Sequence, residues 1–178
     1  MNELFRSNDR MVRWASSPAV SGDGVHGAIP ALIEKILALN TGLLAATVRR
    51  ERENLEAEAD ALFGAGRHFL IYGSLAPGGP NHQKLAEIAG SWTRGWLNGE
   101  LVASGWGASL GYPALCWNAS GPRVEAWLLR SEDLPLHWDN LDAFEGPGYL
   151  RLLAPFWTAD GLAAVGYYYG VAERGGGY

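Results

Sequence analysis

The sequence predicts an α+β fold in which helices flank a small antiparallel β-barrel-like sheet and a helical extension precedes it. Three observations support this prediction. Apolar residues recur at helical spacing before residue 66, whereas short apolar or alternating runs separated by turn residues follow it. A single strongly helical segment, residues 131–146, interrupts those runs. Five or six short strands with one or two helices are typical of antiparallel barrels.

The aromatic residues divide the 178-residue chain into two parts. Seven of the eight tryptophans and all seven tyrosines lie after residue 66. The sequence Gly64-Ala65-Gly66 stands at this change in composition, and glycines are typical of helix ends and hinges. We therefore expect an N-terminal extension over residues 1–66 and a second domain over residues 67–178.

Within the extension, residues 1–27 are rich in small and polar residues and are expected to be loosely ordered. Apolar residues then recur at helical spacing: Ile29, Leu32, Ile33, Ile36, Leu37, Leu43, Leu44 and Val48. The polar tract that follows predicts a helix with ion pairs Arg49–Glu53 and Arg52–Glu56. Its apolar stripe is narrow and consists of Leu55, Ala59, Leu62 and Phe63. Two interpretations remain open: helices packed on the second domain, or an arm that forms a homodimer.

The second part predicts six strands and two helices. The expected strands are His68–Tyr72, Trp92–Ala103, Tyr112–Trp117, Arg123–Leu129, Leu150–Trp157 and Ala163–Tyr169. Glycines at positions 95 and 99 indicate a bent second strand. A short helix is expected over His82–Ala89, with Leu85, Ile88 and Ala89 inward. The stronger helix presents Leu134, Trp138, Leu141 and Phe144 on one face and ends at Gly146.

Composition excludes several classes of function. The net charge of −5 and the absence of a Lys/Arg stripe argue against nucleic-acid binding and against docking on anionic lipid. The single Cys116 and the four widely spaced histidines give no metal-ligand pattern. Polar residues interrupt the apolar run over residues 28–48, and the N-terminus lacks the pattern of a signal peptide. We expect a cytoplasmic protein without a metal or a membrane span.

The stretch "YGSLAPGG" ends an apolar run at residues 72–79. A strand that stops at Gly73 and Ser74 leaves successive backbone N–H groups without sheet partners, and glycine lets a ligand approach the main chain. Such N–H groups can bind anions or a developing oxyanion. The stretch lacks the Gly-Lys-Ser/Thr ending of a phosphate-binding loop and the G-x-S-x-G frame of a serine nucleophile. A tight turn without a ligand would explain the same residues.

The stretch "LDAFEGPGYLR" places Glu145 at the end of the stronger helix. A carboxylate there is close to the negative end of the helix dipole and to an apolar surface. Both effects disfavour the charged form and raise the pKa, which suits proton transfer near neutral pH. A solvated glutamate at a helix end is the alternative interpretation.

Taken together, four segments resemble the gamma-glutamyl cyclotransferase-like family in content and order. They are "YGSLAPG" (72–78), "GWLNGELVASGWGASLGYPAL" (95–115), "VEAWLL" (124–129) and "LDAFEGPGYLR" (141–151), and the resemblance extends over about residues 68–170. It implies a barrel-like fold in which the loop of Tyr72, Gly73, Ser74 and Leu75 binds the glutamyl moiety through its backbone amides. The glutamate of the second motif, Glu145, would be the general acid/base.

The same resemblance assigns Tyr149 and Arg151 to the aromatic and basic positions that follow the family's glutamate. It also implies an activity: enzymatic members convert gamma-glutamyl compounds to 5-oxoproline and a free amine without metal or cofactor. The substrate's own amine attacks its gamma-carbonyl, so folding the substrate supplies much of the required orientation. We therefore expect a gamma-glutamyl substrate and no cofactor.

Two features depart from the family. Many relatives place a basic residue directly after the Tyr-Gly-Ser/Thr-Leu motif, where this chain has Ala76 and Pro77, and the extension is not part of the family core. They motivate an alternative function, a non-catalytic small-molecule-binding domain whose helical arm recruits a protein. A third hypothesis is a serine hydrolase that uses Ser74 with His82 or His137.

Overall fold

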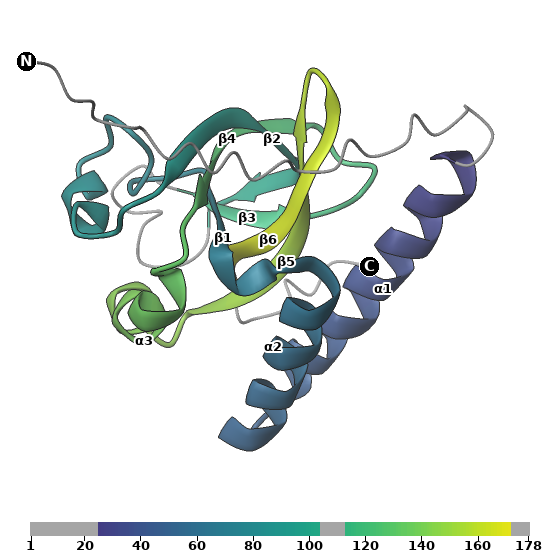
Figure 1. Cartoon of the computed structure of the whole chain (residues 1–178), viewed down its shortest axis with the longest axis horizontal. Coiled ribbons are helices and arrows are strands. Elements are labelled where there is room, and N and C mark those ends of the chain that lie inside the picture. The colour runs from purple at the N-terminus through teal and green to yellow at the C-terminus, as the bar shows by residue number, and fades with distance from the viewer. Residues whose placement is uncertain (1–24, 104–112, 172–178) are drawn as a thin grey trace, which may run out of the picture.

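The computed structural model describes residues 25–103 and 113–171. Its elements follow in the order α1 (Val25–Ala45), α2 (Arg49–Phe63), η1 (Ala65–Arg67), β1 (His68–Ile71), η2 (His82–Leu85), β2 (Ser91–Val102), β3 (Ala114–Trp117), β4 (Arg123–Arg130), α3 (Leu134–Glu145), β5 (Tyr149–Thr158) and β6 (Gly161–Val171) (Figure 1). The segment expected to be loosely ordered lies outside the described residues except for its last three, which belong to α1. Tyr112, the expected start of β3, also lies outside them.

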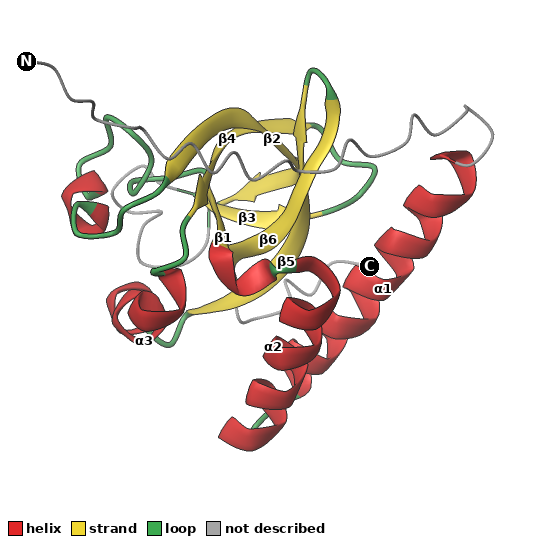
Figure 2. Ribbon diagram, viewed as in Figure 1, coloured by secondary structure: helices red, strands yellow, loops and turns green. Residues whose placement is uncertain are grey.

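The six strands form one sheet that closes into a barrel (Figure 2). Their order is β3-β2-β4-β1-β6-β5, and an additional pairing between β2 and β5 closes five of them, with β3 outside on β2. All pairs are antiparallel except β1 with β6. The predicted α+β fold with an antiparallel barrel-like sheet is therefore confirmed.

Two glycines of β2 allow neighbouring strands to approach it closely. A Cβ atom at Gly95 would lie 2.2 Å from the carbonyl oxygen of Trp157, next to the point where β2 meets β5. At Gly99, β2 leaves β4 and pairs with β3, and a Cβ atom there would lie 2.5 Å from the carbonyl oxygen of Cys116. Only a residue without a side chain permits such close backbone approach, which explains the bend expected in this strand.

The core of the barrel is continuous with the buried face of α1. Tyr167, Phe69 and Phe156 are its largest fully buried side chains, and Ile36 and Leu43 of α1 are fully buried in the same cluster. Burying an apolar side chain of this size contributes roughly 1.5–3 kcal/mol. The extension therefore packs on the barrel, as the first of the two interpretations holds, and dimer formation stays a prediction.

Polar contacts fix the two N-terminal helices in place. The buried side chain of Asn40 donates to the carbonyl of Leu153 at 2.8 Å and accepts from its N–H at 2.7 Å, which docks α1 on β5. Lys35 of α1 pairs with Glu58 of α2 at 2.7 Å. The expected pairs within α2, Arg49–Glu53 at 2.7 Å and Arg52–Glu56 at 3.0 Å, are both present.

One residue of the expected stripe in α2 differs: Leu62 is 49% exposed, whereas Ala59 is buried. Among the described helices, α1 is also the one that is long and apolar enough to cross a membrane, over Ala28–Ala45, by length and composition alone. A helix that packs on a core satisfies the same criterion. Here α1 is docked on β5 through the side chain of Asn40.

The helix expected over His82–Ala89 is wrong in type and length. The structure has a short 3-10 helix, η2, over His82–Leu85, followed by a further turn in which Ile88 N–H donates to the Leu85 carbonyl at 3.1 Å. Bonds of this tight type do not extend far, and Gly90 follows at once. Leu85 and Ile88 are buried as expected, but Ala89 is exposed.

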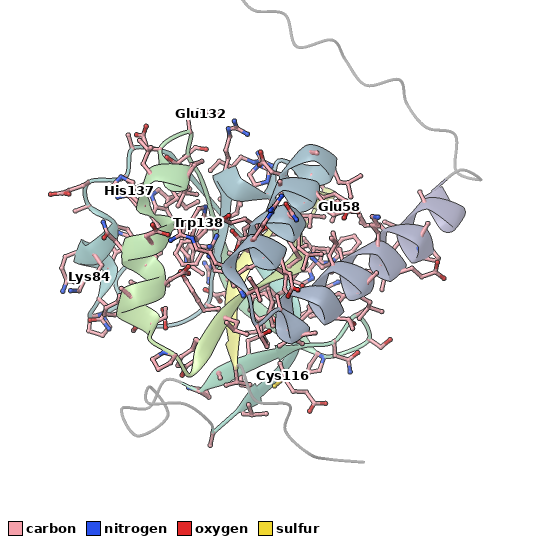
Figure 3. The ribbon with its side chains drawn as sticks, turned by 90° about the horizontal axis from the view of Figure 1, so that it is seen from below. Glu58, Lys84, Cys116, Glu132, His137 and Trp138 are labelled. Carbon is pink, nitrogen blue, oxygen red and sulfur yellow. The ribbon has the colours of Figure 1, made fainter. Side chains whose placement is uncertain are left out.

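The helix α3 agrees with its prediction. Leu134, Trp138 and Leu141 are buried, and Trp138 lies on the side of α3 that faces the barrel (Figure 3). The indole N–H of Trp138 donates to the carbonyl of Gly66 at 2.8 Å, which ties α3 to the start of β1. The helix ends at Gly146, whose φ of 77° favours glycine.

Candidate active site

A cavity of about 210 Å³ opens where β1 leaves the barrel. It is smaller than the roughly 300–1,000 Å³ of pockets for drug-sized ligands, so its size fits a ligand of about amino-acid dimensions. Its lining residues are Phe69, Leu70, Ile71, Tyr72, Gly73, Ser74, Leu75, Pro80, Asn81, Pro113, Glu145, Tyr149 and Tyr169. The structure thus brings together six of the seven residues expected in the site.

The loop after β1 is folded by its own backbone. The N–H groups of Ala76, Gly79 and Asn81 donate to the carbonyls of Gly73, Ala76 and Ser74 at 3.0, 2.8 and 3.0 Å. A Cβ atom at Gly79 would lie 2.3 Å from the carbonyl oxygen of Ser74, so this turn requires glycine. The loop is therefore shaped before any ligand binds.

The N–H groups of Gly73, Ser74 and Leu75 differ from those of the residues that follow. Among the described residues, none accepts a hydrogen bond from these three donors. A Cβ atom at Gly73 would meet no heavy atom within 4 Å, so the backbone there borders open space. Partly buried donors without partners are costly unless a ligand or water satisfies them.

Tyr72 serves as an anchor for the loop. Its hydroxyl donates to the carbonyl of Tyr169 at 2.6 Å and accepts from the N–H of Leu115 at 3.0 Å. Burial raises the pKa of the Tyr72 hydroxyl well above its ordinary value, so it stays neutral. The side chain of Tyr72 is thus held by two strands at the edge of the cavity.

Ser74 is held by an amide and not by an imidazole. The side-chain N–H of Asn81 donates to Ser74 Oγ at 2.9 Å, and His82 Nδ1 donates to the carbonyl of Leu75 at 3.0 Å. Within the described part of the chain, no hydrogen bond joins Ser74 to His82 or to His137 of α3. This arrangement does not supply the serine–histidine pair that the hydrolase hypothesis needs.

Glu145 is the last residue of α3 and lines the same cavity as the loop. Burial raises the pKa of its carboxyl group from 4.5 to about 7, the direction expected from the sequence. The group can therefore take up and release a proton close to neutral pH. Glu145 also contributes to the raised pKa of Tyr72 and of Tyr169, two residues of the same cavity.

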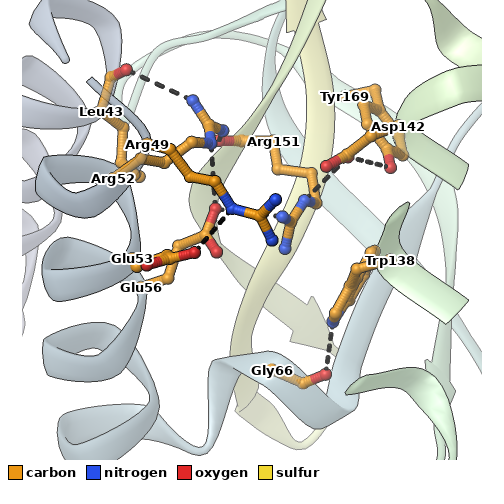
Figure 4. A network of polar contacts seen from close by, with 10 residues as sticks. All are labelled: Leu43, Arg49, Arg52, Glu53, Glu56, Gly66, Trp138, Asp142, Arg151 and Tyr169. Carbon is orange, nitrogen blue, oxygen red and sulfur yellow. Dashed lines mark hydrogen bonds and ion pairs between the residues drawn. The ribbon is translucent and has the colours of Figure 1, made fainter. Parts of the chain in front are cut away.

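The last two expected residues, Tyr149 and Arg151, lie in different places. Tyr149 lines the cavity, but Arg151 does not. The guanidinium of Arg151 is bound by two carboxylates, Asp142 at 2.8 Å and Glu56 at 3.0 Å, and its side chain is only 7% exposed (Figure 4). Arg151 therefore joins α2, α3 and β5, and its expected contact with a substrate stays a prediction.

Two lining residues that form polar contacts, Asn81 and Tyr169, were not expected in the site from the sequence. Asn81 orients Ser74, and Tyr169 accepts from Tyr72 through its carbonyl and donates to Asp142 through its hydroxyl at 2.7 Å. An asparagine in a turn and a tyrosine in a strand are common, so neither gives a signal by itself. In residues 25–103 and 113–171, no group of three His, Cys, Asp or Glu side chains could hold a metal ion.

A family model described as gamma-glutamyl cyclotransferase, AIG2-like, matches residues 69–176. None of the curated proteins compared with the chain matches it. Three solved structures are similar: YkqA from Bacillus subtilis (22% identity, TM-score 0.46), an AIG2-like protein from Mus musculus (22%, 0.49) and an uncharacterised protein from Pyrococcus horikoshii (15%, 0.42). They cover 59%, 62% and 60% of this chain. This chain covers 35%, 80% and 79% of theirs, so it spans about a third of YkqA.

Proposed function

The chain belongs to the gamma-glutamyl cyclotransferase, AIG2-like family, and we propose that it cyclises a gamma-glutamyl amide to 5-oxoproline and releases the amine. We further propose that it does so in the cytoplasm and without a cofactor. The observation that carries the proposal is that Glu145 lines the same small cavity as the loop whose N–H groups at residues 73–75 have no acceptor among the described residues.

In the proposed reaction, the alpha-amine nitrogen of the substrate attacks its own gamma-carbonyl carbon and closes a five-membered ring. The carboxylate of Glu145 accepts the proton that the amine loses. The carbonyl oxygen becomes an oxyanion, which the N–H groups of Gly73, Ser74 and Leu75 stabilise. Preorganised donors of this kind contribute about 2.7–4 kcal/mol each where they have been removed singly from other enzymes.

The second half of the reaction returns the proton. The carbon–nitrogen bond of the original amide breaks, and Glu145 donates its proton to the departing nitrogen, so the enzyme ends as it began. One group can serve as base and then as acid because its pKa of about 7 makes both forms accessible. Activity should require the ionised form at the start and fall about tenfold per pH unit below pH 7.

The charge of the residues that line the cavity affects how a negatively charged substrate can be bound. No Lys or Arg is among the described lining residues, and Ala76 stands where many relatives have a basic residue. In our proposal the backbone donors of the loop also receive the negative groups of the glutamyl moiety. Tyr149 and Tyr169 form the aromatic wall on the side of β5 and β6.

The test uses a panel of gamma-glutamyl amines, gamma-glutamyl dipeptides and glutathione, with 5-oxoproline detected by mass spectrometry. The parent protein should release 5-oxoproline from at least one compound, and Glu145→Gln should lower kcat by about 10²–10⁴-fold while keeping the shape of the side chain. Release by Glu145→Gln at the parental rate would refute the mechanism. Binding of panel compounds without turnover would instead favour the alternative, a non-catalytic small-molecule-binding domain.

A further inference from the structure

A network of polar contacts connects the N-terminal extension to the helix that carries Glu145. Its first member is Glu56 of α2, a residue outside the region that the family model matches. One oxygen of Glu56 accepts from Arg52 at 3.0 Å and pairs with Arg151 of β5 at 3.0 Å (Figure 4). Arg52 also donates to the backbone carbonyl of Arg151 at 3.2 Å. The helix α2 therefore holds both the side chain and the backbone of Arg151.

Arg151 in turn contacts the last turn of α3. Its Nε donates to Asp142 at 2.8 Å, and Asp142 lies one helical turn before Glu145. The guanidinium also lies over the rings of Trp138 and Tyr167, at 4.9 and 5.4 Å from their centroids. These contacts leave the guanidinium little freedom to move, so the position of Asp142 depends on how Arg151 is held.

Asp142 also connects to the loop on the other side of the cavity. It accepts from the hydroxyl of Tyr169 at 2.7 Å, and the carbonyl of Tyr169 accepts from the hydroxyl of Tyr72 at 2.6 Å. Two parts of the cavity lining, the end of α3 and the loop that begins at Tyr72, are thus connected through the carboxylate of Asp142. Asp142 is bound by the guanidinium of Arg151, and Glu56 binds the same guanidinium.

We propose that Glu56 is a positioning residue of the site: through Arg151 and Asp142 it fixes the last turn of α3 so that Glu145 faces the cavity. The extension is then a working part of the active site, although it lies outside the matched family region. The kinetic part of this inference rests on the proposed function, whereas the structural part does not.

The first experiment compares Glu56→Gln with Glu58→Gln in the full chain. Glu58 lies on the same helix (Figure 3) and pairs with Lys35 of α1. Its substitution therefore also removes one charge and one ion pair, but it leaves the contacts of Arg151 in place. With the panel compound that the parent turns over best, Glu56→Gln should lower kcat about tenfold and change KM less than twofold. Glu58→Gln should leave both within twofold of the parent.

If Glu56 only stabilised the fold, the kinetic result would be different. In that case Glu56→Gln would lower the melting temperature, but kcat per folded molecule well below that temperature would equal that of Glu58→Gln, and the inference would be overturned. Glu56→Asp keeps the charge with a shorter reach and should recover part of the lost kcat. If Glu56→Gln does not fold, Glu56→Asp takes its place against Glu58→Asp, with a smaller loss of kcat expected.

The second experiment needs no turnover and follows the carboxyl titration of Glu145 by NMR in glutamate-labelled protein. A loosened helix end admits water to the carboxyl group, so Glu56→Gln should lower the pKa of Glu145 by at least half a unit, and Glu58→Gln should not. The shift should persist at 1 M salt, where a purely long-range charge effect is screened. An unchanged titration, or a shift that disappears in salt, would overturn the inference.

Other titratable groups lie near Glu145 and bear on its titration. Tyr72 beside the loop, Tyr149 of β5 and Tyr169 of β6 line the same cavity. Asp142 lies one helical turn before Glu145, and Lys84 lies 5.1 Å from the ring centroid of the neighbouring Phe144. If the parent releases no 5-oxoproline from any compound, the proposed function fails, and the NMR comparison alone decides whether Glu56 positions Glu145.

Discussion

The two sides of the last turn of α3 present carboxylates in opposite settings. Asp142 is on the network side, where it accepts hydrogen bonds from Arg151 at 2.8 Å and from Tyr169 at 2.7 Å. Glu145 is on the cavity side, where burial raises its pKa to about 7. One helical turn thus separates Asp142, whose charge is compensated by Arg151, from Glu145, whose charged form is disfavoured by burial.

This difference indicates that neighbouring carboxylates of one helix can have separate roles, one in stabilising the fold and one in proton transfer. A carboxylate bound by a guanidinium and a hydroxyl holds elements together through charge-assisted hydrogen bonds. A carboxylate whose charged form is disfavoured by burial can exchange a proton near neutral pH, at a cost in stability. The contacts of Asp142 fix the end of α3. Glu145, at that fixed end, faces an environment in which its carboxyl group can exchange a proton.

The network side is tested most strongly by Arg151→Met. The side chain of Arg151 is nearly buried between two carboxylates, and removing it leaves Asp142 and Glu56 without their shared cation. Breaking such a pair from one side costs about 3–5 kcal/mol, so we expect the free energy of unfolding in urea to fall by about 4 kcal/mol. The control is Arg49→Met, which removes a surface pair and should leave the urea midpoint unchanged. Equal stability of the two variants would contradict the comparison.

On the cavity side, the substitution Glu145→Gln should raise the free energy of unfolding, whereas Arg151→Met lowers it. The folded-state pKa of Glu145, about 7, lies above its ordinary 4.5, so the folded protein binds this proton more tightly than the unfolded chain does. Its contribution to stability is complete below about pH 4.5 and is lost as the pH rises to 7. Replacing Glu145 should therefore stabilise the protein by about 2–3 kcal/mol at pH 8 and by little at pH 4.5.

Urea unfolding at these two pH values checks this sign. The exposed Glu87 provides the matched control, since Glu87→Gln makes the same substitution outside the cavity. A Glu145→Gln variant that is less stable than the parent at pH 8 would show that the carboxylate is compensated in the fold, as Asp142 is. The distinction between the two sides would then be lost.

The shape of the loop on the cavity side is tested by Gly79→Ala. The added methyl would lie 2.3 Å from the carbonyl oxygen of Ser74 and 2.9 Å from that of Ala76, so the turn must shift. Forcing a methyl into a filled site costs about 1–3 kcal/mol, and we expect a loss of about 2 kcal/mol in urea unfolding. Ligand binding should weaken as well, because residues 73–75 move with the turn. A fully stable variant would mean that the loop is not fixed in advance.

The sequence predicts local features of this fold and site well. The alternating runs gave the strands, the glycines of β2 indicated its bend, and Gly146 ended α3 as expected. Glu145 and the loop after β1 were found because each stands at the end of a regular element, where composition changes abruptly. Such signals depend on neighbours in the chain and can be read from it.

Contacts between distant segments could not be predicted in this way. Arg151 follows the glutamate motif and resembles a ligand-binding arginine, but Glu56, far away in the sequence, decides where its guanidinium lies. The same holds for Tyr169, whose two partners come from α3 and from the start of the loop. The helix expected over His82–Ala89 failed for a local reason, since tight turns near Gly90 replaced regular helical bonds.

The smallest expected effect, Gly73→Ala, is the most specific test of the cavity side. A methyl at Gly73 meets no heavy atom within 4 Å, so the fold should tolerate it and the melting temperature should not change. Because Gly73 lines the cavity, the methyl should occupy ligand space beside the backbone donors and raise KM about tenfold, or about 1.4 kcal/mol. Gly148→Ala is the matched control: it also meets open space but is exposed and does not line the cavity. Equal KM values for the two variants would show that the ligand does not approach the main chain at residue 73, and the backbone of this loop would then have no part in binding.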